Sequence, residues 1–272
     1  MPEGRQIPHH GEAIVLRTWP FHEADLLVSL FTRDQGKVKG VARHAMRSRR
    51  RFGGALEPAT RVLAHYTERP KQELVRLDSF EILWSPLTAP INYLRTAALQ
   101  LVTEVLEEAM PDLAPEDNLY RLAVTVLSSI QTGVLETGQL ATDRLQDASG
   151  KPQIYLPVTY FCLWMNRLMG WMPELGHCAA CGLHLGDPAL KGQTVYWSPV
   201  ADGVTCADDR RPQSRALSAA SVAESHRIAR TPLADLTTED WPAIRAADLR
   251  AFAIGTLERH LERRLRSAAA LA

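Results

Sequence analysis

The sequence has no long hydrophobic run and only four cysteines. No apolar stretch approaches the ~18 residues that a membrane-spanning helix needs. The first residues, Met1 to Arg5, have no apolar stretch of the signal-peptide type behind them. We therefore expect a cytoplasmic protein with reduced thiols, which favours metal ligands or redox groups over a structural disulfide for Cys178 and Cys181.

Motifs that mark common enzyme sites are also missing. The sequence has no P-loop, no G-x-G-x-x-G after a strand, no H-E-x-x-H and no G-x-S-x-G. The carboxylates of Glu104, Glu107 and Glu108 are typical of the solvated face of a helix. We therefore expect a protein that is not an enzyme, although a site without a recognisable motif in the helical part stays open as an alternative.

The chain of 272 residues suits two domains. Its first 85 residues predict five short strands separated by Gly and Pro turns, which are Ala13–Trp19, Asp25–Thr32, Lys37–Arg43, Arg61–Tyr66 and Glu73–Ile82. Five strands in so short a stretch favour a small barrel over residues 1–84. An SH3-like barrel and an OB-fold both fit the strand count.

After Pro86 the apolar residues recur at helical spacing. We expect helices from Tyr93, from near Glu116, around Pro157, over Ser218–Arg230 and from about Glu239. Their inward stripes would include Leu101, Val105, Phe161, Trp164, Ile244, Leu257 and Leu261. The predicted fold class is therefore α+β, with a helical domain at 85–272 that is interrupted by a cysteine-containing hairpin at about 176–212.

Charge is balanced overall but unevenly distributed. Residues 1–80 carry 14 basic and 9 acidic side chains, and the remainder carries 17 and 22. Seven cations and no anion lie between Lys37 and Arg51, which suggests phosphate binding, although a merely basic, solvated loop is the alternative. The predicted nucleic-acid-binding residues are Lys37, Lys39, Arg43, Arg47, Arg49, Arg50, Arg51 and Phe52. Phe52 is the best candidate for an exposed ring that stacks on a base, and a place in the core is the alternative.

Cys178 and Cys181 have the C-x-x-C spacing of a zinc knuckle and are followed by Gly182. Cys206 follows after 24 residues, with Asp209 where a second C-x-x-C would place its second cysteine. The candidate zinc ligands are thus Cys178, Cys181, Cys206 and Asp209, with His177 or His184 as substitutes. A hairpin held by packing without metal is the alternative, and Cys162 is expected in the core.

The ordered set of these motifs resembles the RecO family. The resemblance covers nearly the whole chain and is carried by Gly36-Lys37-x-x-Gly40-Val41-Ala42-Arg43, by Arg49-Arg50-Arg51-Phe52-Gly53-Gly54-Ala55-Leu56-Glu57-Pro58, by Leu168-Met169-Gly170-x-x-Pro173-x-Leu175-x-x-Cys178-x-x-Cys181-Gly182, by Ser198-Pro199-x-x-x-Gly203-Val204-x-Cys206 and by Leu261 to Ser267. The chain departs from the family pattern at Asp209, where many members have cysteine.

The resemblance implies an OB-fold and a zinc-ribbon-like hairpin. It also implies a recombination mediator of the RecF pathway that binds single- and double-stranded DNA, anneals complementary strands and helps load RecA. RecR and single-stranded DNA-binding protein are the implied protein partners, and the nucleoid is the implied location. An RNA-binding regulatory module with the same barrel and hairpin is the alternative.

Overall fold

The computed structural model describes residues 6–69, 72–88, 91–130 and 154–271. The chain forms two compact units, Met1–Leu127 and Ser128–Ala272. We describe each unit by itself. No helix within the described residues is long and apolar enough to cross a membrane.

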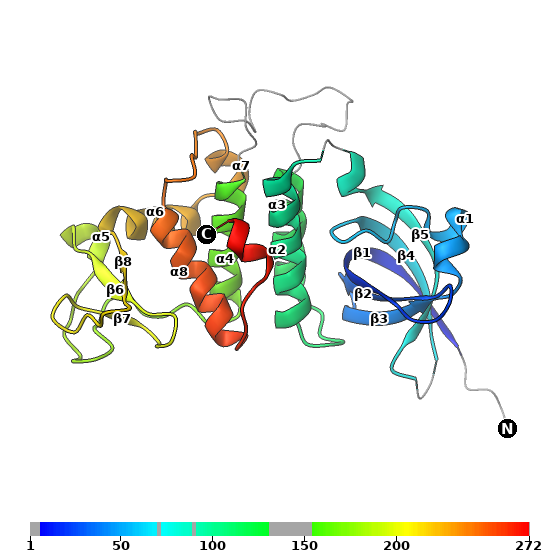
Figure 1. The fold of residues 1–272 in the computed structure, drawn as a ribbon, viewed down its shortest axis with the longest axis horizontal. Coiled ribbons are helices and arrows are strands. Elements are labelled where there is room, and N and C mark those ends of the chain that lie inside the picture. Colours follow the sequence, from blue (N-terminus) through cyan, green and yellow to red (C-terminus); the bar gives the residue numbers. More distant parts are fainter. Residues whose placement is uncertain (1–5, 70–71, 89–90, 131–153, 272) are drawn as a thin grey trace. The chain divides into compact units, whose positions relative to one another are not determined.

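The first unit is built on a closed five-stranded barrel (Figure 1). Its strands are β1 (Ile7–Pro20), β2 (Leu26–Thr32), β3 (Gly36–Ala42), β4 (Arg61–Glu68) and β5 (Val75–Trp84). They close in the order β1-β2-β3-β5-β4, and only the contact between β3 and β5 is parallel among the pairs around this barrel. This topology is that of an OB-fold and decides between the two barrels that the strand count allowed.

The short helix α1 (Arg49–Phe52) lies between β3 and β4 and contributes to the barrel core. Phe52 is 1% exposed and meets Phe80 of β5 edge-on, with ring centroids 5.4 Å apart. Ala45 and Ala55, on either side of α1, belong to the same buried cluster. The segment between β3 and β4 therefore contributes apolar side chains to the barrel interior.

Helix α2 (Tyr93–Ala109) packs against β1 and extends the first unit beyond the barrel. Glu107 of α2 is buried and accepts a hydrogen bond from Ser29 of β2, so our expectation that Glu107 is a solvated carboxylate is wrong. Helix α3 (Asp117–Ile130) meets the barrel through Tyr120, whose ring lies edge-on to Phe31. The barrel strands end at Trp84, but these contacts place α2 and most of α3 in the same compact unit.

The second unit is helical with a small three-stranded sheet. Its elements are α4 (Tyr155–Leu168), α5 (Pro188–Lys191), β6 (Val195–Trp197), β7 (Val204–Thr205), β8 (Arg215–Leu217), α6 (Ala219–Arg230), α7 (Leu233–Leu236) and α8 (Ala247–His260). Helix α4 packs on α8, and α5 packs on α6. Six of the seven predicted inward residues are buried at least in part: Leu101, Val105, Phe161 and Leu257 are fully buried, and Trp164 and Leu261 are partly buried.

Two details differ from the expected helices. The last helix begins at Ala247 and not near Glu239, because Pro242 interrupts the segment and Ala246 adopts a left-handed φ of 50°. Ile244 consequently lies outside the helix and is 85% exposed. Residues 131–153, for which we expect a loop, lie outside the described residues.

Candidate nucleic-acid interface and metal centre

The outward face of β3 carries Lys37 and Lys39, but the ammonium of Lys37 contacts residues at the end of α2 and just after it. Its ammonium donates to the backbone carbonyl of Glu107 at 2.8 Å and lies 3.3 Å from the carboxylate of Asp112. The Lys37 side chain is only 8% exposed, whereas that of Lys39 is 34% exposed and lies 3.6 Å from Asp112. Our expectation of an exposed Lys37 is therefore wrong, and this ammonium joins β3 to the end of α2.

Phe52 also differs from its expected place. It lies in the barrel core and has no exposed ring face on which a base can stack. The reason is the helical turn of α1, which directs Phe52 inward while Arg50 stays exposed. The guanidinium of Arg51 lies 5.2 Å from the Phe52 ring centroid. Arg51 is half-buried and Phe52 is buried, so only the cation of this pair reaches the surface.

The other cations of the basic stretch are accessible. Arg43, Arg47 and Arg50 are exposed, and none of them forms an ion pair with the described part of the chain. Arg51 is half-buried and donates to the carbonyl of Arg43 at 2.6 Å. The side chain of Arg49 lies outside what the structure describes. Three free guanidinium groups therefore remain on the segment that follows β3.

A pocket of about 680 Å³ opens beside Arg43, between the β1–β2 loop and the β4–β5 loop. We call it the loop pocket; its lining residues are Phe21, His22, Asp25, Val41, Arg43, His44, Arg69, Gln72, Glu73, Leu74, Val75 and Arg76. In OB-folds, these two loops and the face of strands 2 and 3 form the usual site for oligonucleotides. The loop pocket thus lies where the fold itself favours a bound strand.

Backbone hydrogen bonds hold the first wall of the loop pocket in place. The amide of Phe21 donates to the carbonyl of Asp25 at 3.1 Å, and the amide of His44 donates to Asp25 Oδ1 at 2.7 Å. His44 adopts a left-handed φ of 55°, an uncommon conformation for a residue with a side chain. The first hydrogen bond closes the β1–β2 loop, and the bond from His44 to Asp25 connects this loop to the end of β3.

The cations of the other wall are Arg69, which follows β4, and Arg76 of β5. Arg76 is held by Asp78 at 2.7 Å, whereas the buried Nε of Arg69 has no partner among the described groups. Phe21 is 42% exposed and offers an accessible ring at the pocket. Our sequence-based residue set omits Arg69 and Arg76 because they lie far from the basic stretch in sequence. The parallel pairing of Gly40 with Val75 brings the two regions together.

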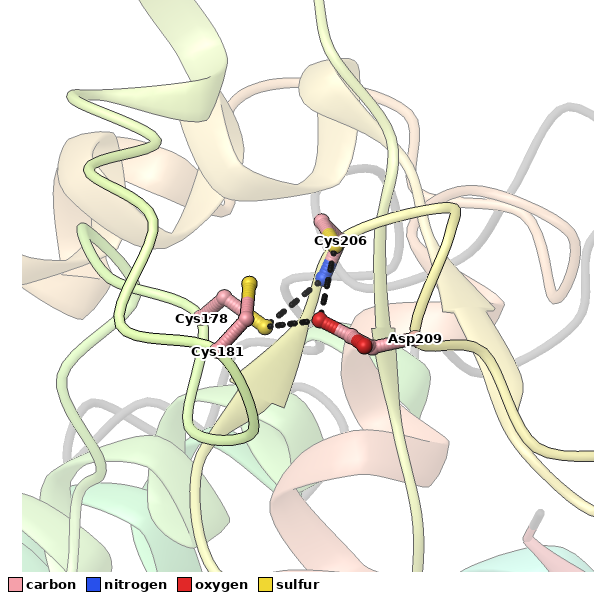
Figure 2. Close-up of side chains that lie close together, drawn as sticks. All are labelled: Cys178, Cys181, Cys206 and Asp209. Atoms are coloured by element: carbon pink, nitrogen blue, oxygen red, sulfur yellow. Dashed lines mark hydrogen bonds between the residues drawn. The ribbon is translucent and has the colours of Figure 1, made fainter.

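In the second unit, three cysteines and one aspartate converge (Figure 2). The candidate ligand atoms of Cys178, Cys181, Cys206 and Asp209 all lie within 4.8 Å of one another. Asp209 Oδ2 lies 3.2 Å from the sulfur of Cys178 and 3.2 Å from that of Cys206. The structure therefore brings together the four candidate ligands that the sequence spacing suggests.

A tight knuckle positions the first two cysteines. The amide of Gly182 donates to the carbonyl of Cys178 at 2.9 Å, and Gly182 has a φ of 72°, which favours glycine. The amide of Ala179 donates to the carbonyl of Val204 at 2.8 Å, which fixes the knuckle beside β7 and Cys206. His177 and His184 hydrogen bond to each other at 3.0 Å and are not part of the convergent set.

Hydrogen bonds between the three thiols and the carboxylate of Asp209 shift the pKa values of these groups. Hydrogen bonds from Cys181, Cys206 and Cys178 lower the pKa of Asp209. The hydrogen bond to Asp209 raises the pKa of Cys181 to about 12 and also raises the pKa of Cys206. Three thiols and one carboxylate form a donor set that fits tetrahedral zinc, because a dication would stabilise all four groups in their charged form.

Buried Cys162 is separate from this cluster and belongs to the core, as expected. Burial raises the pKa of its thiol to about 12. A thiol that is fully buried and protonated is a packing residue and not a ligand or nucleophile.

Comparisons with known proteins match both parts of the chain. Residues 7–86 match the family described as "Recombination protein O N terminal", and residues 143–269 match "Recombination protein O C terminal". The chain is 45% identical over 255 residues to "DNA repair protein RecO" of Koribacter versatilis, with 94% of each chain covered. It is 31% identical over 254 residues to the protein of that name from Anaeromyxobacter dehalogenans, with 93% of this chain and 91% of the relative covered.

Proposed function

Because the chain belongs to the RecO family of DNA repair and recombination proteins, we propose that it binds single- and double-stranded DNA, anneals complementary strands and helps load RecA. Its action is binding without a catalytic step. RecR and single-stranded DNA-binding protein are its partners in this proposal. The chromosome in the cytoplasm is the place where such a protein acts.

The loop pocket is the observation that carries this proposal. It combines the exposed guanidinium of Arg43 and the half-buried guanidinium of Arg69 with an exposed ring on Phe21. Cations attract the phosphates of a strand, and an aromatic ring binds the face of any base, so this combination suits a single strand of mixed sequence. The strand then continues over Arg47 and Arg50, which are exposed on the segment after β3.

Annealing follows from the same chemistry. Two complementary strands repel each other through their phosphates, and cations bound to the backbones reduce that repulsion. Phosphate contacts carry no sequence information and leave base edges available for pairing. A protein with such a surface therefore accelerates annealing without any covalent step.

In this proposal the cysteine cluster holds a structural zinc ion through Cys178, Cys181, Cys206 and Asp209. The ion would connect the knuckle at residues 178–181 to Cys206 and Asp209, which follow strand β7 of the small sheet. A four-ligand zinc site is coordinatively closed and contributes folding stability, not catalysis. The hairpin thus supports the second unit and takes no part in a reaction.

The test is an annealing assay on complementary strands coated with single-stranded DNA-binding protein. We expect Arg43→Ala combined with Arg69→Ala to slow annealing by about tenfold, in line with the loss of two phosphate contacts. Arg121→Ala is the matched control, since Arg121 is an exposed arginine on α3 that pairs with Asp117 and lies outside the loop pocket. Annealing at the uncatalysed rate by the unaltered protein would contradict the proposal.

A comparison of DNA and RNA affinity distinguishes the proposed function from an RNA-binding regulatory module. An OB-fold groove with stacking rings accepts either nucleic acid, because every base has an aromatic face. Equal-length DNA and RNA strands measured at the same salt concentration decide between them. Tighter binding of RNA, with no annealing of DNA, would favour the regulatory module.

A further inference from the structure

Building on the proposed DNA binding, we propose that the loop pocket takes up one unpaired nucleotide of the bound strand and selects guanine through the carboxylates of Glu73 and Asp25. This deepens the proposed function, since it adds a preferred base to a strand-binding site. Neither carboxylate has a role in contacts to phosphates.

The loop pocket has the size and lining for a whole nucleotide. Its volume of about 680 Å³ lies within the range of sites that enclose small ligands, roughly 300–1,000 Å³. Part of the lining is apolar and suits the face of a base; these residues are Phe21, Val41, Leu74 and Val75. The cations Arg43 and Arg69 suit the phosphate of the same nucleotide.

The loop pocket also contains two acidic residues, Asp25 and Glu73, which phosphate binding does not explain. A pocket that binds only phosphates loses affinity through every carboxylate in its wall, because like charges repel. Glu73 is exposed, and neither of its carboxylate oxygens forms a hydrogen bond or ion pair with a described residue. Asp25 uses Oδ1 to accept the amide of His44 and retains Oδ2 for a ligand.

Carboxylates distinguish bases by their hydrogen-bond donors. An ionised carboxylate only accepts hydrogen bonds, and its two oxygens match two adjacent donors. Guanine presents the adjacent N1–H and N2–H groups on its Watson–Crick edge, whereas the other three bases present a donor beside an acceptor. An unpaired base exposes this edge and is read there while its face stacks on an aromatic ring. The loop pocket provides such a ring in Phe21.

The experiment measures binding of the full chain to labelled oligo(dT) strands of about 12 nucleotides, a length within the site sizes of OB-folds. Each strand carries one central dG, dA, dC or dI, and one strand carries only dT. We expect the dG strand to bind about 5- to 20-fold more tightly than the dT strand, the lower part of the range for a bidentate base contact. The dI strand, which lacks the 2-amino group, should fall between them.

Glu73→Gln replaces one oxygen by an amide donor and removes the charge. We expect it to abolish the dG advantage and to leave affinity for the dT strand unchanged or higher. Glu23→Gln is the matched control: Glu23 is an exposed residue of the β1–β2 loop that does not line the loop pocket, so it changes the net charge equally. That variant should keep the dG advantage.

Three outcomes overturn the inference. One is equal affinity of the unaltered protein for all five strands. A second is a Glu73→Gln protein that binds every strand more tightly by the same factor, because the carboxylate then only repels DNA. A third is an Arg43→Ala protein with unchanged affinity for all strands, and this result also overturns the proposed function, whereas the first two leave it intact.

Discussion

Phe52 contributes to the barrel core and contacts Phe80 edge-on. Replacing it with alanine leaves a cavity among the buried residues of the barrel. We expect Phe52→Ala to lower the free energy of unfolding by about 3–5 kcal/mol, the usual cost of a buried phenylalanine. Urea titration measures this loss. DNA affinity, measured where the variant is still folded, should stay unchanged, and a weakened affinity without loss of stability would mean that Phe52 contacts DNA.

The ammonium of Lys37 is buried and hydrogen bonded, whereas that of Lys39, two residues later, is more exposed. Lys37→Met removes the hydrogen bond to the Glu107 carbonyl and the ion pair with Asp112. We expect it to cost about 1–3 kcal/mol of unfolding free energy, because a buried acceptor then lacks its partner. Lys39→Met, which removes a more exposed cation, should cost less than about 1 kcal/mol. Unfolding midpoints of the two variants give the comparison, and equal stabilities would contradict the assigned role of Lys37.

The errors at these two residues have a common physical origin. Alternation along β3 correctly predicts that Lys37 points out of the barrel, but it does not predict that the end of α2 covers that face. The run of arginines before Phe52 suggests a solvated loop, yet a single turn of helix directs Phe52 into the barrel interior. Sequence periodicity defines the face of an element and not what packs on it.

At the scale of elements, four of the five barrel strands are predicted to within two residues, whereas β1 begins at Ile7, six residues before its predicted start. Ser218 accepts the amide of Ser221 as the N-cap of α6. The strand order could not be predicted. The parallel contact between β3 and β5 joins residues 40–42 to residues 75–77, far apart in sequence. That contact distinguishes the OB-fold and builds the loop pocket, so neither Arg69 nor Arg76 could be assigned to the site from local patterns.

The cysteine hairpin is the element where the C-x-x-C spacing was most informative. We expect about one zinc ion per chain in protein purified without chelator, measured by metal analysis. Asp209→Ala should lower zinc affinity at least tenfold, whereas Asp209→Cys should restore or exceed it, because thiolate is a strong zinc ligand. Glu174→Gln is the control, since Glu174 hydrogen bonds to His177 outside the cluster.

Acid should release the metal, because zinc needs thiolates and protons compete for them. In the metal-free protein the hydrogen bonds from the thiols lower the pKa of Asp209. That contribution to stability is present above the ordinary pKa of the carboxyl and is lost as the pH falls through the lowered value. Zinc affinity that does not change between neutral and acidic pH would contradict thiolate ligation, and a metal content near zero would mean that packing alone holds the hairpin.

The whole molecule is neutral, yet its charge is divided between regions. The first 80 residues have a basic excess of five and the rest an acidic excess of five. The buried ammonium of Lys37 contributes to this excess but is not available to phosphates. The charge available for the proposed DNA binding is therefore smaller than the count from the sequence, and we expect it on Arg43, Arg47, Arg50 and Arg69.

This distribution predicts the salt dependence of DNA binding. If these four cations each contact a phosphate of a single strand, log K should fall with log salt with a slope of roughly −3, at about −0.7 for each contact. Arg47→Ala combined with Arg50→Ala should flatten the slope by about 1.4 units. Thermal stability should barely change, because both side chains are exposed. Titrations of oligo(dT) at several salt concentrations measure the slope, and Lys37→Met, compared at a temperature where it is folded, should leave it unaltered. A double variant with the full slope would show that Arg47 and Arg50 do not contact DNA and would confine binding to the loop pocket.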